Sequence, residues 1–451
     1  MEKVVRIVGG GLAGSEAAYQ LARRGVCVEL FEMRPGRMTE AHASGDLGEL
    51  VCSNSLRSNS LYAPAGLLKE EMRKLDSLVI RTAEGARVPA GSALAVDREL
   101  FARALTAAVE ALPGVTLIRR EVQEIPSGMV ILASGPLTSP ALAQEVASLL
   151  GQEYLYFYDA ISPIVTAESI DMDIAFRASR YDRDGDDYLN LPLTRQDYYA
   201  FVDALVKADR VPTHRFERFV PFEGCMPIEE MADRGKDTLA FGPMRAVGLF
   251  DQRTGRRPYA VVQLRQENRE RTLYNLVGFQ TKMTYPEQRR VFAMIPGLAR
   301  AEFIRLGSLH RNTFIHSPLH LLPTLQWRQR DTLFFAGQMT GVEGYIESAA
   351  TGLLAGMNAA RLLSDQPPQV PPETTALGAL LRYISDSQRK NFQPMNVNFG
   401  LLPPLSGLRG KAKKEAMSQR ALADMAAWVH ELDGSRNENL SSSSPIDAAA
   451  R

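Results

Sequence analysis

The sequence predicts an α/β fold in which a nucleotide-binding domain is interrupted by an inserted α+β domain. Near the amino end a short apolar run, Val4 to Val8, leads directly into a glycine-rich turn. From about Tyr154 the chain changes to aromatic and β-branched runs separated by charged turns, and from Thr332 an apolar strand and a long helix return. With 451 residues, 45% hydrophobic and 23% charged, the chain has room for two or three domains and a sizeable core.

Periodicity and helix breakers place the elements of the first part. We expect buried strands at 4–8, 26–31, 94–96, 115–118 and 129–133, and helices from the glycine turn to Arg24, at 65–78 and at 98–112. The second of these helices rests on apolar residues that recur at helical spacing, namely Leu68, Met72, Leu75 and Val79. A long loop rich in glycine, serine and asparagine separates Glu32 from that helix, and loops of this length are usually functional or disordered.

The first strand is followed by the motif Gly9-x-Gly11-x-x-Gly14, which also opens a helix. In a Rossmann-type fold the first glycine makes the tight turn, the second admits a pyrophosphate, and the third packs helix on strand. The helix start, with Gly10, Leu12 and Ala13, then supplies backbone amides for the phosphates. Glu32 ends the second strand, where a carboxylate can accept from ribose hydroxyls. These residues are our candidates for cofactor binding.

Two further segments favour FAD over NAD or S-adenosylmethionine as the dinucleotide-like ligand. Val130 to Gly135 resembles the strand and glycine turn of two-dinucleotide-fold flavoproteins. Phe334 to Gly337, with the helix that follows Gly344 and Tyr345, resembles their carboxyl-terminal flavin motif. In that motif a helix amino terminus points at the flavin pyrimidine edge. Gly135, Gly337, Gly344 and Tyr345 therefore join the cofactor candidates.

These patterns divide the chain into five segments. We expect a first part of the FAD-binding domain at 1–153, the inserted domain at 154–305, a returning part at 306–364, a helical segment at 365–435 and a disordered, serine-rich tail at 436–451. Inside the inserted domain, Thr194 and Asp197 predict a capping box for a helix at 197–208. The turn at 182–187 lacks the glycine and glutamate of a calcium loop, so no metal site is expected there.

Charge and cysteine content restrict the possible settings. Lysine plus arginine and aspartate plus glutamate each number 52, so nucleic-acid binding requires a local basic patch. The three cysteines form no CxxC pair, which argues against a zinc ribbon or a disulfide scaffold. The longest uncharged run near the carboxyl end has 13 residues, fewer than the roughly 20 that span a bilayer. We expect a cytoplasmic protein with no membrane segment, no bound metal and no obligate protein partner.

Several longer motifs are more specific than the glycine turn. They are Glu49 to Leu56, Phe222 to Pro227, Val262 to Glu267, Leu276 to Thr281, His310 to Thr313 and Ala336 to Gly352. With these motifs the chain resembles the folate- and FAD-dependent tRNA (uracil-5-)-methyltransferase family, TrmFO, from Val4 to about Ala427. The resemblance implies that methylenetetrahydrofolate supplies a one-carbon unit, FAD carries it, and NADPH or NADH supplies electrons. The acceptor it implies is C5 of the tRNA T-loop uridine, giving ribothymidine.

Two cysteines suit this chemistry. C5 of uracil is a poor nucleophile until a thiolate adds at C6, and a base must later remove the C5 proton. Cys225 stands just before Pro227, a favourable first helical residue, and a helix amino terminus favours thiolate. We predict Cys225 as the C6 nucleophile and Cys52 as the flavin-side partner or base, although the two roles could be reversed. Cys27, inside the second strand, is expected to be inert.

One histidine and two basic clusters complete the candidates. By resemblance, the imidazole of His310 stacks on the pterin of folate, whereas a loop histidine by itself is more often solvated. Nine basic and four acidic residues lie between Arg234 and Arg271, near Phe250 and Tyr259, and a second cluster spans 409–414. Such clusters can bind RNA phosphates while the aromatic residues stack on bases, although either can be an ordinary solvated face.

Three alternatives remain at this stage. The same folate chemistry could act on a ribosomal uridine, because target choice depends on surface shape. Alternatively, the same fold could catalyse a different reaction, as in the larger FAD-dependent enzymes that modify the tRNA wobble uridine, but the chain lacks their long carboxyl-terminal helical domain. A flavoprotein acting as a redox sensor or binding module is disfavoured by the two loop cysteines.

Overall fold

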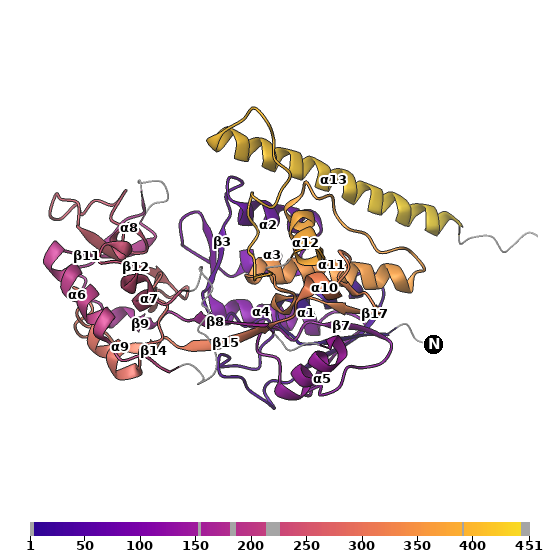
Figure 1. Cartoon of the computed structure of the whole chain (residues 1–451), viewed down its shortest axis with the longest axis horizontal. Coiled ribbons are helices and arrows are strands. Elements are labelled where there is room, and N and C mark those ends of the chain that lie inside the picture. Colours follow the sequence, from indigo (N-terminus) through magenta and orange to yellow (C-terminus); the bar gives the residue numbers. More distant parts are fainter. Residues whose placement is uncertain (1–3, 152–154, 181–185, 213–225, 390–391, 443–451) are drawn as a thin grey trace, which may run out of the picture.

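The computed structural model describes residues 4–151, 155–180, 186–212, 226–389 and 392–442. Two large sheets dominate it, and they lie in separate lobes of the molecule (Figure 1). The first lobe contains the glycine turn, and the second is built largely from the middle of the chain.

A six-stranded sheet forms the centre of the first lobe, in the order β16-β17-β7-β1-β2-β6. Its strands are β1 (Val4–Val8), β2 (Cys27–Glu32), β6 (Val115–Arg119), β7 (Met129–Leu132), β16 (Gln326–Trp327) and β17 (Arg330–Phe335). Apart from the antiparallel edge pair β16–β17, neighbouring strands are parallel. The returning strand β17 thus lies beside β7, although about 200 residues separate them in the chain. This confirms the predicted parallel α/β fold.

Helices α1 (Leu12–Ala22) and α11 (Tyr345–Leu363) pack together closely on this sheet. Two glycines of α11 permit the contact. A Cβ atom added at Gly352 would lie 2.1 Å from the carbonyl oxygen of Ala13, and one at Gly356 would lie 2.7 Å from that of Ala17. Since real Cβ contacts are never this short, any side chain at either position would push the two helices apart.

One expectation for the first lobe is corrected. The predicted helix at 65–78 is two helices, α2 (Pro64–Lys74) and α3 (Leu78–Gly85). The chain breaks between them because Asp76 adopts a left-handed conformation and the Ser77 hydroxyl caps α3 by accepting from the Ile80 amide. The predicted strand at 94–96 is β5 (Ala93–Val96), which pairs with β3 (Ser55–Ser58) and β4 (Arg87–Val88) in a separate small sheet. Helix α4 (Arg98–Glu110) leads from it to β6.

The second lobe is a six-stranded sheet in the order β10-β11-β12-β13-β9-β14, all pairs antiparallel. Its strands are β9 (Ile164–Thr166), β10 (Phe176–Arg177), β11 (Tyr188–Leu193), β12 (Ala260–Gln266), β13 (Leu273–Leu276) and β14 (Phe303–Arg305). Its helices include α6 (Arg195–Lys207), α7 (Ile228–Asp233), α8 (Thr238–Phe241) and α9 (Tyr285–Phe292). Helix α6 begins with the predicted Thr194–Asp197 capping box.

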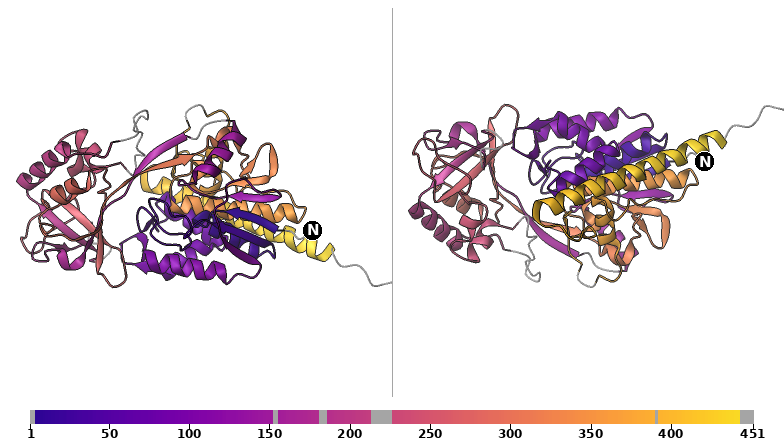
Figure 2. Two further views of the ribbon diagram at one scale, coloured as in Figure 1. Left: turned by 90° about the horizontal axis from the view of Figure 1, so that it is seen from below. Right: turned by 90° about the horizontal axis from the view of Figure 1, so that it is seen from above.

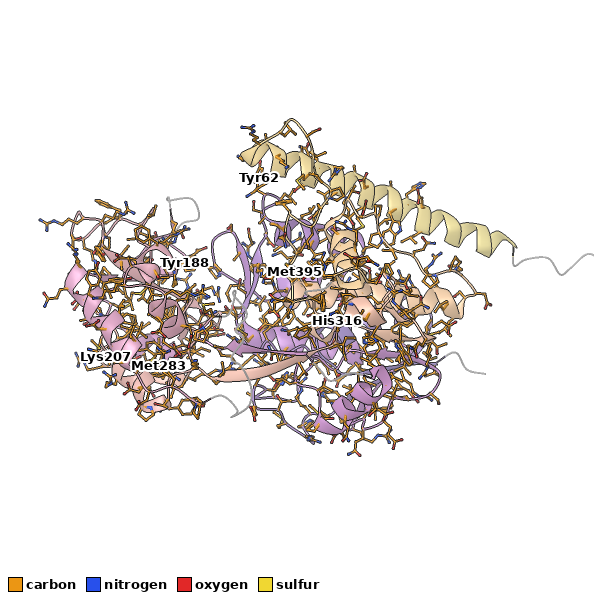
Figure 3. All side chains as sticks on the ribbon, viewed as in Figure 1. Tyr62, Tyr188, Lys207, Met283, His316 and Met395 are labelled. Atoms are coloured by element: carbon orange, nitrogen blue, oxygen red, sulfur yellow. The ribbon has the colours of Figure 1, made fainter. Side chains whose placement is uncertain are left out.

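A two-stranded ribbon connects the lobes. The chain leaves the first lobe along β8 (Leu155–Ala160) and returns along β15 (Leu309–Phe314), which pairs antiparallel with it (Figure 2). The lobes also touch directly, since the hydroxyl of Tyr188, labelled in Figure 3, donates to the Ala90 carbonyl oxygen at 3.1 Å. The second lobe is therefore held against the small sheet of the first.

The remaining helices cover the first lobe. They are α5 (Pro140–Leu150), α10 (Ser317–His320), α12 (Ala376–Ser385) and α13 (Gly410–Ser442). Helix α13 crosses the lobe with its amino end nearer the second lobe (Figures 1 and 2). It also runs into the stretch after residue 435 for which we expected disorder, because no glycine or proline interrupts residues 435–442. Within the described ranges, no helix is long and apolar enough to cross a membrane.

Candidate functional site

The glycine turn has the geometry that its motif predicts. Gly9 has a φ of 107°, and a Cβ at Gly14 would lie 1.8 Å from the Gly9 carbonyl oxygen. Gly11 differs, because no protein atom lies within 4 Å of a Cβ added there. It is the N-cap of α1 and offers no side-chain cap, so the first amides of the helix face open space. Backbone donors at an uncapped helix start form a binding site for phosphate groups.

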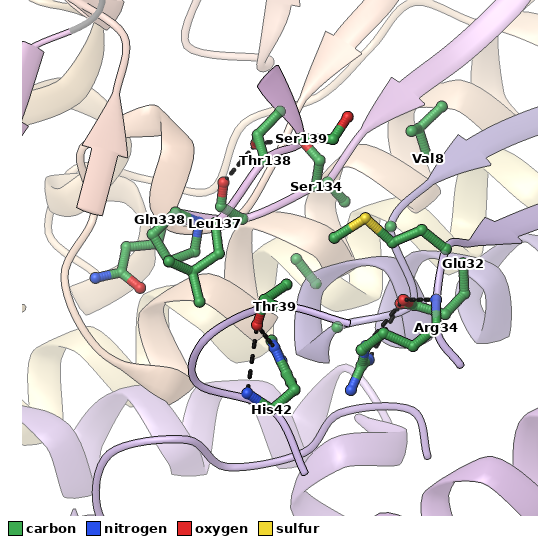
Figure 4. Close-up of a pocket in the computed structure, with 18 of the residues that line it drawn as sticks. Val8, Glu32, Arg34, Thr39, His42, Ser134, Leu137, Thr138, Ser139 and Gln338 are labelled. Carbon is green, nitrogen blue, oxygen red and sulfur yellow. Dashed lines mark hydrogen bonds and ion pairs between the residues drawn. The ribbon is translucent and has the colours of Figure 1, made fainter. Parts of the chain in front are cut away.

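Glu32 lies beside this turn, but its carboxylate is more heavily bonded than the sequence suggests (Figure 4). Its Oε2 accepts from the Gly10 amide at 2.9 Å, and Arg34 donates its backbone amide and two guanidinium N–H groups to the two oxygens. Burial raises the pKa of Glu32, yet the hydrogen bonds and charge of Arg34 hold it below its ordinary value. Four donors occupy the roughly four acceptor positions of a carboxylate. Glu32 thus fixes the glycine turn to β2.

A groove of about 1020 Å³ opens at the carboxyl ends of β1, β7 and β17. In open α/β sheets this is the edge where ligands bind. The structure brings eight of the eleven cofactor candidates to this one groove. They are Gly9, Gly11, Leu12, Ala13, Glu32, Gly135, Gly337 and Tyr345. His42, which was not among the candidates, also lines the groove; its Nδ1 lies 2.6 Å from the Thr39 hydroxyl (Figure 4). We call this the glycine-turn cavity.

A second cavity, of about 1080 Å³, adjoins the first and shares Val51, Pro136, Leu137, Gln338 and Tyr345 with it. Cys52 lines this cavity, so we call it the Cys52 cavity. Gly344, whose φ of 114° suits glycine, and the first residues of α11 form one of its walls. The two cavities therefore meet at the amino end of α11.

Tyr345 connects this helix end to the cysteine. Its hydroxyl oxygen accepts from the Cys52 amide at 2.8 Å and from the Ser53 amide at 3.1 Å. The thiol of Cys52 is half-buried, with its sulfur 3.9 Å from the Ala160 carbonyl oxygen at the end of β8. Cys52 is thus held where the FAD-motif helix and the inter-lobe ribbon come together.

Three arginines from distant elements hold the backbone around Cys52, residues 50–54, which we call the Cys52 loop. Arg98 donates to the carbonyl oxygens of Leu50 and Cys52. Arg305 donates to Val51 at 2.8 Å, and Arg265 donates to the side chains of Ser53 and Asn54. Glu267, which pairs with Arg98 at 2.7 Å, is the carboxylate of this cluster. Three guanidinium groups against one carboxylate leave a positive environment beneath the cavity.

Two buried ionisable groups hold another part of the wall: Glu347 lines the cavity, and Lys69 bonds the backbone of Leu56 and Arg57, which line it. Glu347 is fully buried; its Oε1 accepts from Arg57 and from the Val397 amide, while its Oε2 has no hydrogen-bond partner among the described residues. Burial raises the pKa of Glu347, against the opposing charge of Arg57. Lys69 donates to the carbonyl oxygens of Leu56 and Arg57, and burial, followed by the charge of Arg73, lowers its pKa to about 7. Glu347 thus anchors β3 to α11, and Lys69 anchors it to α2.

Three sequence candidates are placed less completely. Cys225 lies outside the described residues. His310 is paired with Asp159 in the ribbon β15–β8, but its side chain is not described; Asn312 of the same strand lines the Cys52 cavity. Cys27 stands at the start of β2 and is exposed, so it is not the buried residue that its place in a strand suggests. It lies in neither cavity.

Sequence reasoning missed the residues that act through long-range contacts. The three arginines, Lys69 and Glu347 come from segments far apart in the chain, and no local spacing marks them. The paired glycines of α11 are an exception. Gly352 and Gly356 stand four residues apart in an alanine-rich helix, a spacing that could have predicted close packing against another helix.

The parallel sheet, the glycine turn and the cavity at the carboxyl ends of the strands define a dinucleotide-binding α/β protein of the flavoprotein kind. Residues 4–367 match the family described as Glucose inhibited division protein A. The chain is 58% identical to a Geobacter sulfurreducens protein named methylenetetrahydrofolate–tRNA-(uracil-5-)-methyltransferase TrmFO, over 95% of this chain and 99% of that one. A Moorella thermoacetica protein of the same name is 59% identical over 97% and 100%. The chain belongs to the Glucose inhibited division protein A family and, within it, to the TrmFO proteins.

Solved structures agree on the fold. Aquifex aeolicus GidA in its form I crystal superimposes with a TM-score of 0.71 at 16% identity, over 96% of this chain and 76% of that one. The form II crystal gives 0.68, also at 16% identity, over 99% and 79%. At this identity the likeness establishes the architecture alone.

Proposed function

We propose that this chain is a cytoplasmic enzyme that methylates C5 of a uridine in the T-loop of tRNA, with methylenetetrahydrofolate as one-carbon donor, FAD as cofactor and NADPH or NADH as reductant. The observation that carries the proposal is the junction of the two cavities at α11, where Tyr345 holds the Cys52 loop. A dinucleotide in the first cavity would end beside a thiol in the second. TrmFO relatives at 56–59% identity supply the reaction by name.

The residues of the glycine-turn cavity fit FAD. Open space at Gly11 and the uncapped amides of α1 suit a pyrophosphate, and the amino end of α11 suits a pyrimidine edge that gains negative charge. Bound there, FAD would supply electrons and carry the one-carbon unit. Both carboxylate oxygens of Glu32 already accept hydrogen bonds from Gly10 and Arg34, so ribose hydroxyls would have to share them. We therefore propose that the main role of Glu32 is to position Gly10.

In the Cys52 cavity we propose that a thiolate adds to C6 of uracil and that a base removes the C5 proton. We assign the first role to Cys225 and the second, or a flavin-side role, to Cys52. The support among the described residues is Ile228, which follows Cys225 by three positions: its amide donates to the Gln280 carbonyl oxygen, and Gln280 lines the cavity. The reversed assignment of the two cysteines is the alternative.

Folate is proposed to occupy the junction, with the imidazole of His310 stacked on its pterin. The support is the position of the strand: β15 carries His310 and, two residues later, Asn312, which lines the Cys52 cavity. Folate would then lie between this strand and the ligand of the glycine-turn cavity.

The decisive experiment uses labelled one-carbon donors. Purified protein with unmodified tRNA, NADPH and labelled methylenetetrahydrofolate should put label into ribothymidine, and labelled S-adenosylmethionine should not. Transfer from S-adenosylmethionine without folate would overturn the proposal. Ribosomal RNA and tRNA with an unmodified wobble uridine, assayed in parallel, test the two alternative substrates. The full-length relatives above 55% identity carry the TrmFO name, which favours tRNA uracil-5 methylation over both alternatives.

A 5-fluorouridine RNA separates the cysteines, because fluorine does not leave as a proton does and traps the covalent adduct. Cys225→Ala should abolish both turnover and trapping. Cys52→Ala should abolish turnover yet leave some covalent complex. Trapping lost only in Cys52→Ala would exchange the two roles, and normal turnover in both variants would refute thiol catalysis. Cys27→Ala, at an exposed position outside both cavities, is the matched control.

A further inference from the structure

Exposed apolar side chains gather on one part of the second lobe. Phe241, at the end of α8, is 84% exposed, the highest value among the large hydrophobic residues that the structure describes. Within the next ten residues, Val247 is 42% exposed and Phe250 is 54% exposed. Single exposed apolar residues are ordinary on protein surfaces, whereas several together mark a site of interaction.

The backbone that presents these side chains is held firmly. Arg180 donates to the carbonyl oxygens of Arg245 and Val247, at 2.8 and 3.0 Å. Between the exposed residues, Ala246 and Leu249 are buried against Val261 of β12. The aromatic side chains therefore project from a fixed surface.

Exposed cations occur in the same stretch of the chain as these apolar side chains. Lys236, Arg245, Arg256 and Arg257 are exposed, and none has an ion pair with another described residue. The acidic side chains nearby are already engaged: Asp233 pairs with Arg210, Asp237 accepts from Tyr199, and Asp251 pairs with Arg253. We call this surface, made of Lys236, Phe241, Arg245, Val247, Phe250, Arg256 and Arg257, the aromatic–basic face.

We infer that the aromatic–basic face binds the unpaired bases of an RNA loop, with bases stacked on Phe241 and Phe250 and phosphates paired with the four cations. The unpaired bases of an RNA loop offer faces that stack on aromatic side chains, and its phosphates offer negative charge to the cations. The inference rests on the proposed function and adds to it where the RNA docks.

A second basic segment lies on the same side of the molecule. Helix α13 begins at residue 410, within the cluster 409–414, and α8 and this end of α13 are both at the top of Figure 1. There the ammonium group of Lys411 lies 4.6 Å from the ring of Tyr62, which Figure 3 labels. A folded RNA could therefore contact both lobes at once.

The test compares Phe241→Ala and Phe250→Ala with Tyr285→Ala. Tyr285 is a matched control, because it is an aromatic residue of the same lobe, 55% exposed, on α9 at the opposite end of the lobe in Figure 1. We expect the Kd for unmodified tRNA to rise about tenfold for each phenylalanine variant, the size of a lost base stack, and Tyr285→Ala to bind as the unaltered protein does. Filter binding at fixed salt measures this.

A second variant tests the phosphate contacts. Arg256→Gln with Arg257→Gln should make the slope of log Kd against log salt shallower by about 1.4, because each lost phosphate contact of a single strand accounts for about 0.7. Unchanged tRNA affinity in both phenylalanine variants would overturn the inference. So would an oligomer of the unaltered protein that Phe241→Ala converts to monomer, since the face would then be a self-interface. If the unaltered protein binds tRNA through this face but transfers no methyl group, the proposed function fails and the inference stands.

Discussion

The glycine-turn cavity and the Cys52 cavity adjoin each other but are built differently. The first is made of backbone: three glycines, the uncapped amides of α1 and the carboxyl ends of neighbouring parallel strands. The second is made of side chains brought together from α4, β12, β14 and α11. A backbone site is specified by a short stretch of sequence, whereas a side-chain site exists only after both lobes have packed.

Their electrostatics differ as well. In the glycine-turn cavity Glu32 is neutralised by Arg34, so the local field comes mainly from the start of α1. Beneath the Cys52 cavity three buried arginines face the single carboxylate Glu267. Burial lowers the pKa of Arg265 and of Arg305, which records the cost of holding these charges out of water. The Cys52 loop is thus positioned at some expense in stability, as expected of a site that must be preorganised.

The largest effect should come from Gly11, and it should separate ligand binding from folding. Gly11→Val places its Cβ where no protein atom lies within 4 Å, so the protein should fold. The new side chain enters the space of the pyrophosphate, and we expect the flavin content to fall at least about tenfold. Absorbance after purification measures this, and the thermal midpoint should match that of flavin-free unaltered protein, because bound ligand itself stabilises.

Gly14→Ala is the contrasting variant. Its Cβ would lie 1.8 Å from the Gly9 carbonyl oxygen, so helix α1 must move away from β1 and the protein itself should be destabilised. A folded Gly11→Val protein that kept its full flavin content would disprove the assignment of this cavity.

The same contrast explains how much of the molecule the sequence could predict. The strand–turn–helix at residues 4–22, the returning strand before Gly337 and the capping box at Thr194 follow from local patterns, and the structure contains them. The helix at 65–78 was wrong because apolar spacing continues across the break at Asp76. The separate sheet of β5 could not be predicted, because a strand's partner depends on the other strands available.

The residues of the candidate site also divide into those that the sequence predicts and those that it does not. Gly9, Gly11 and Glu32 were found from the motif, and Cys52 from a resemblance. The roles of three other residues, Arg98, Arg305 and Glu347, could not be predicted. Each of them bonds a group that lies more than 200 residues away in the chain or belongs to the other lobe. No periodicity or spacing within one sequence encodes such contacts.

A smaller effect, on the Cys52 cavity alone, should follow from Arg98→Met. This change leaves Glu267 buried without its bidentate partner, which costs about 3–5 kcal/mol, and frees the carbonyl oxygens of Leu50 and Cys52. Denaturant unfolding measures the loss. Arg103→Met is the matched control, because Arg103 lies on the same helix in an exposed pair with Glu99 that contributes little. Equal losses in the two variants would mean that the Cys52 loop is not held by the buried pair.

The smallest effect is a pH dependence that arises at Lys69, which bonds the backbone of two residues that line the Cys52 cavity. Lys69 has a pKa of about 7 in the folded protein, below the 10.5 of an ordinary lysine, because it is buried. Between these values the unfolded chain binds more protons than the folded one, so the contribution of Lys69 to stability rises as pH increases from about 7 to about 10.5. Lys69→Met removes this rise and also leaves the Leu56 and Arg57 carbonyl oxygens without their donor. We therefore expect the free energy of unfolding of the variant, measured in urea at several pH values, to lack the upward slope of the unaltered protein over that range.

Lys74→Met, on the same helix α2 but at its exposed end, should keep the slope. Equal slopes in the Lys69 and Lys74 variants would mean that burial does not lower the pKa of Lys69 below that of an ordinary lysine.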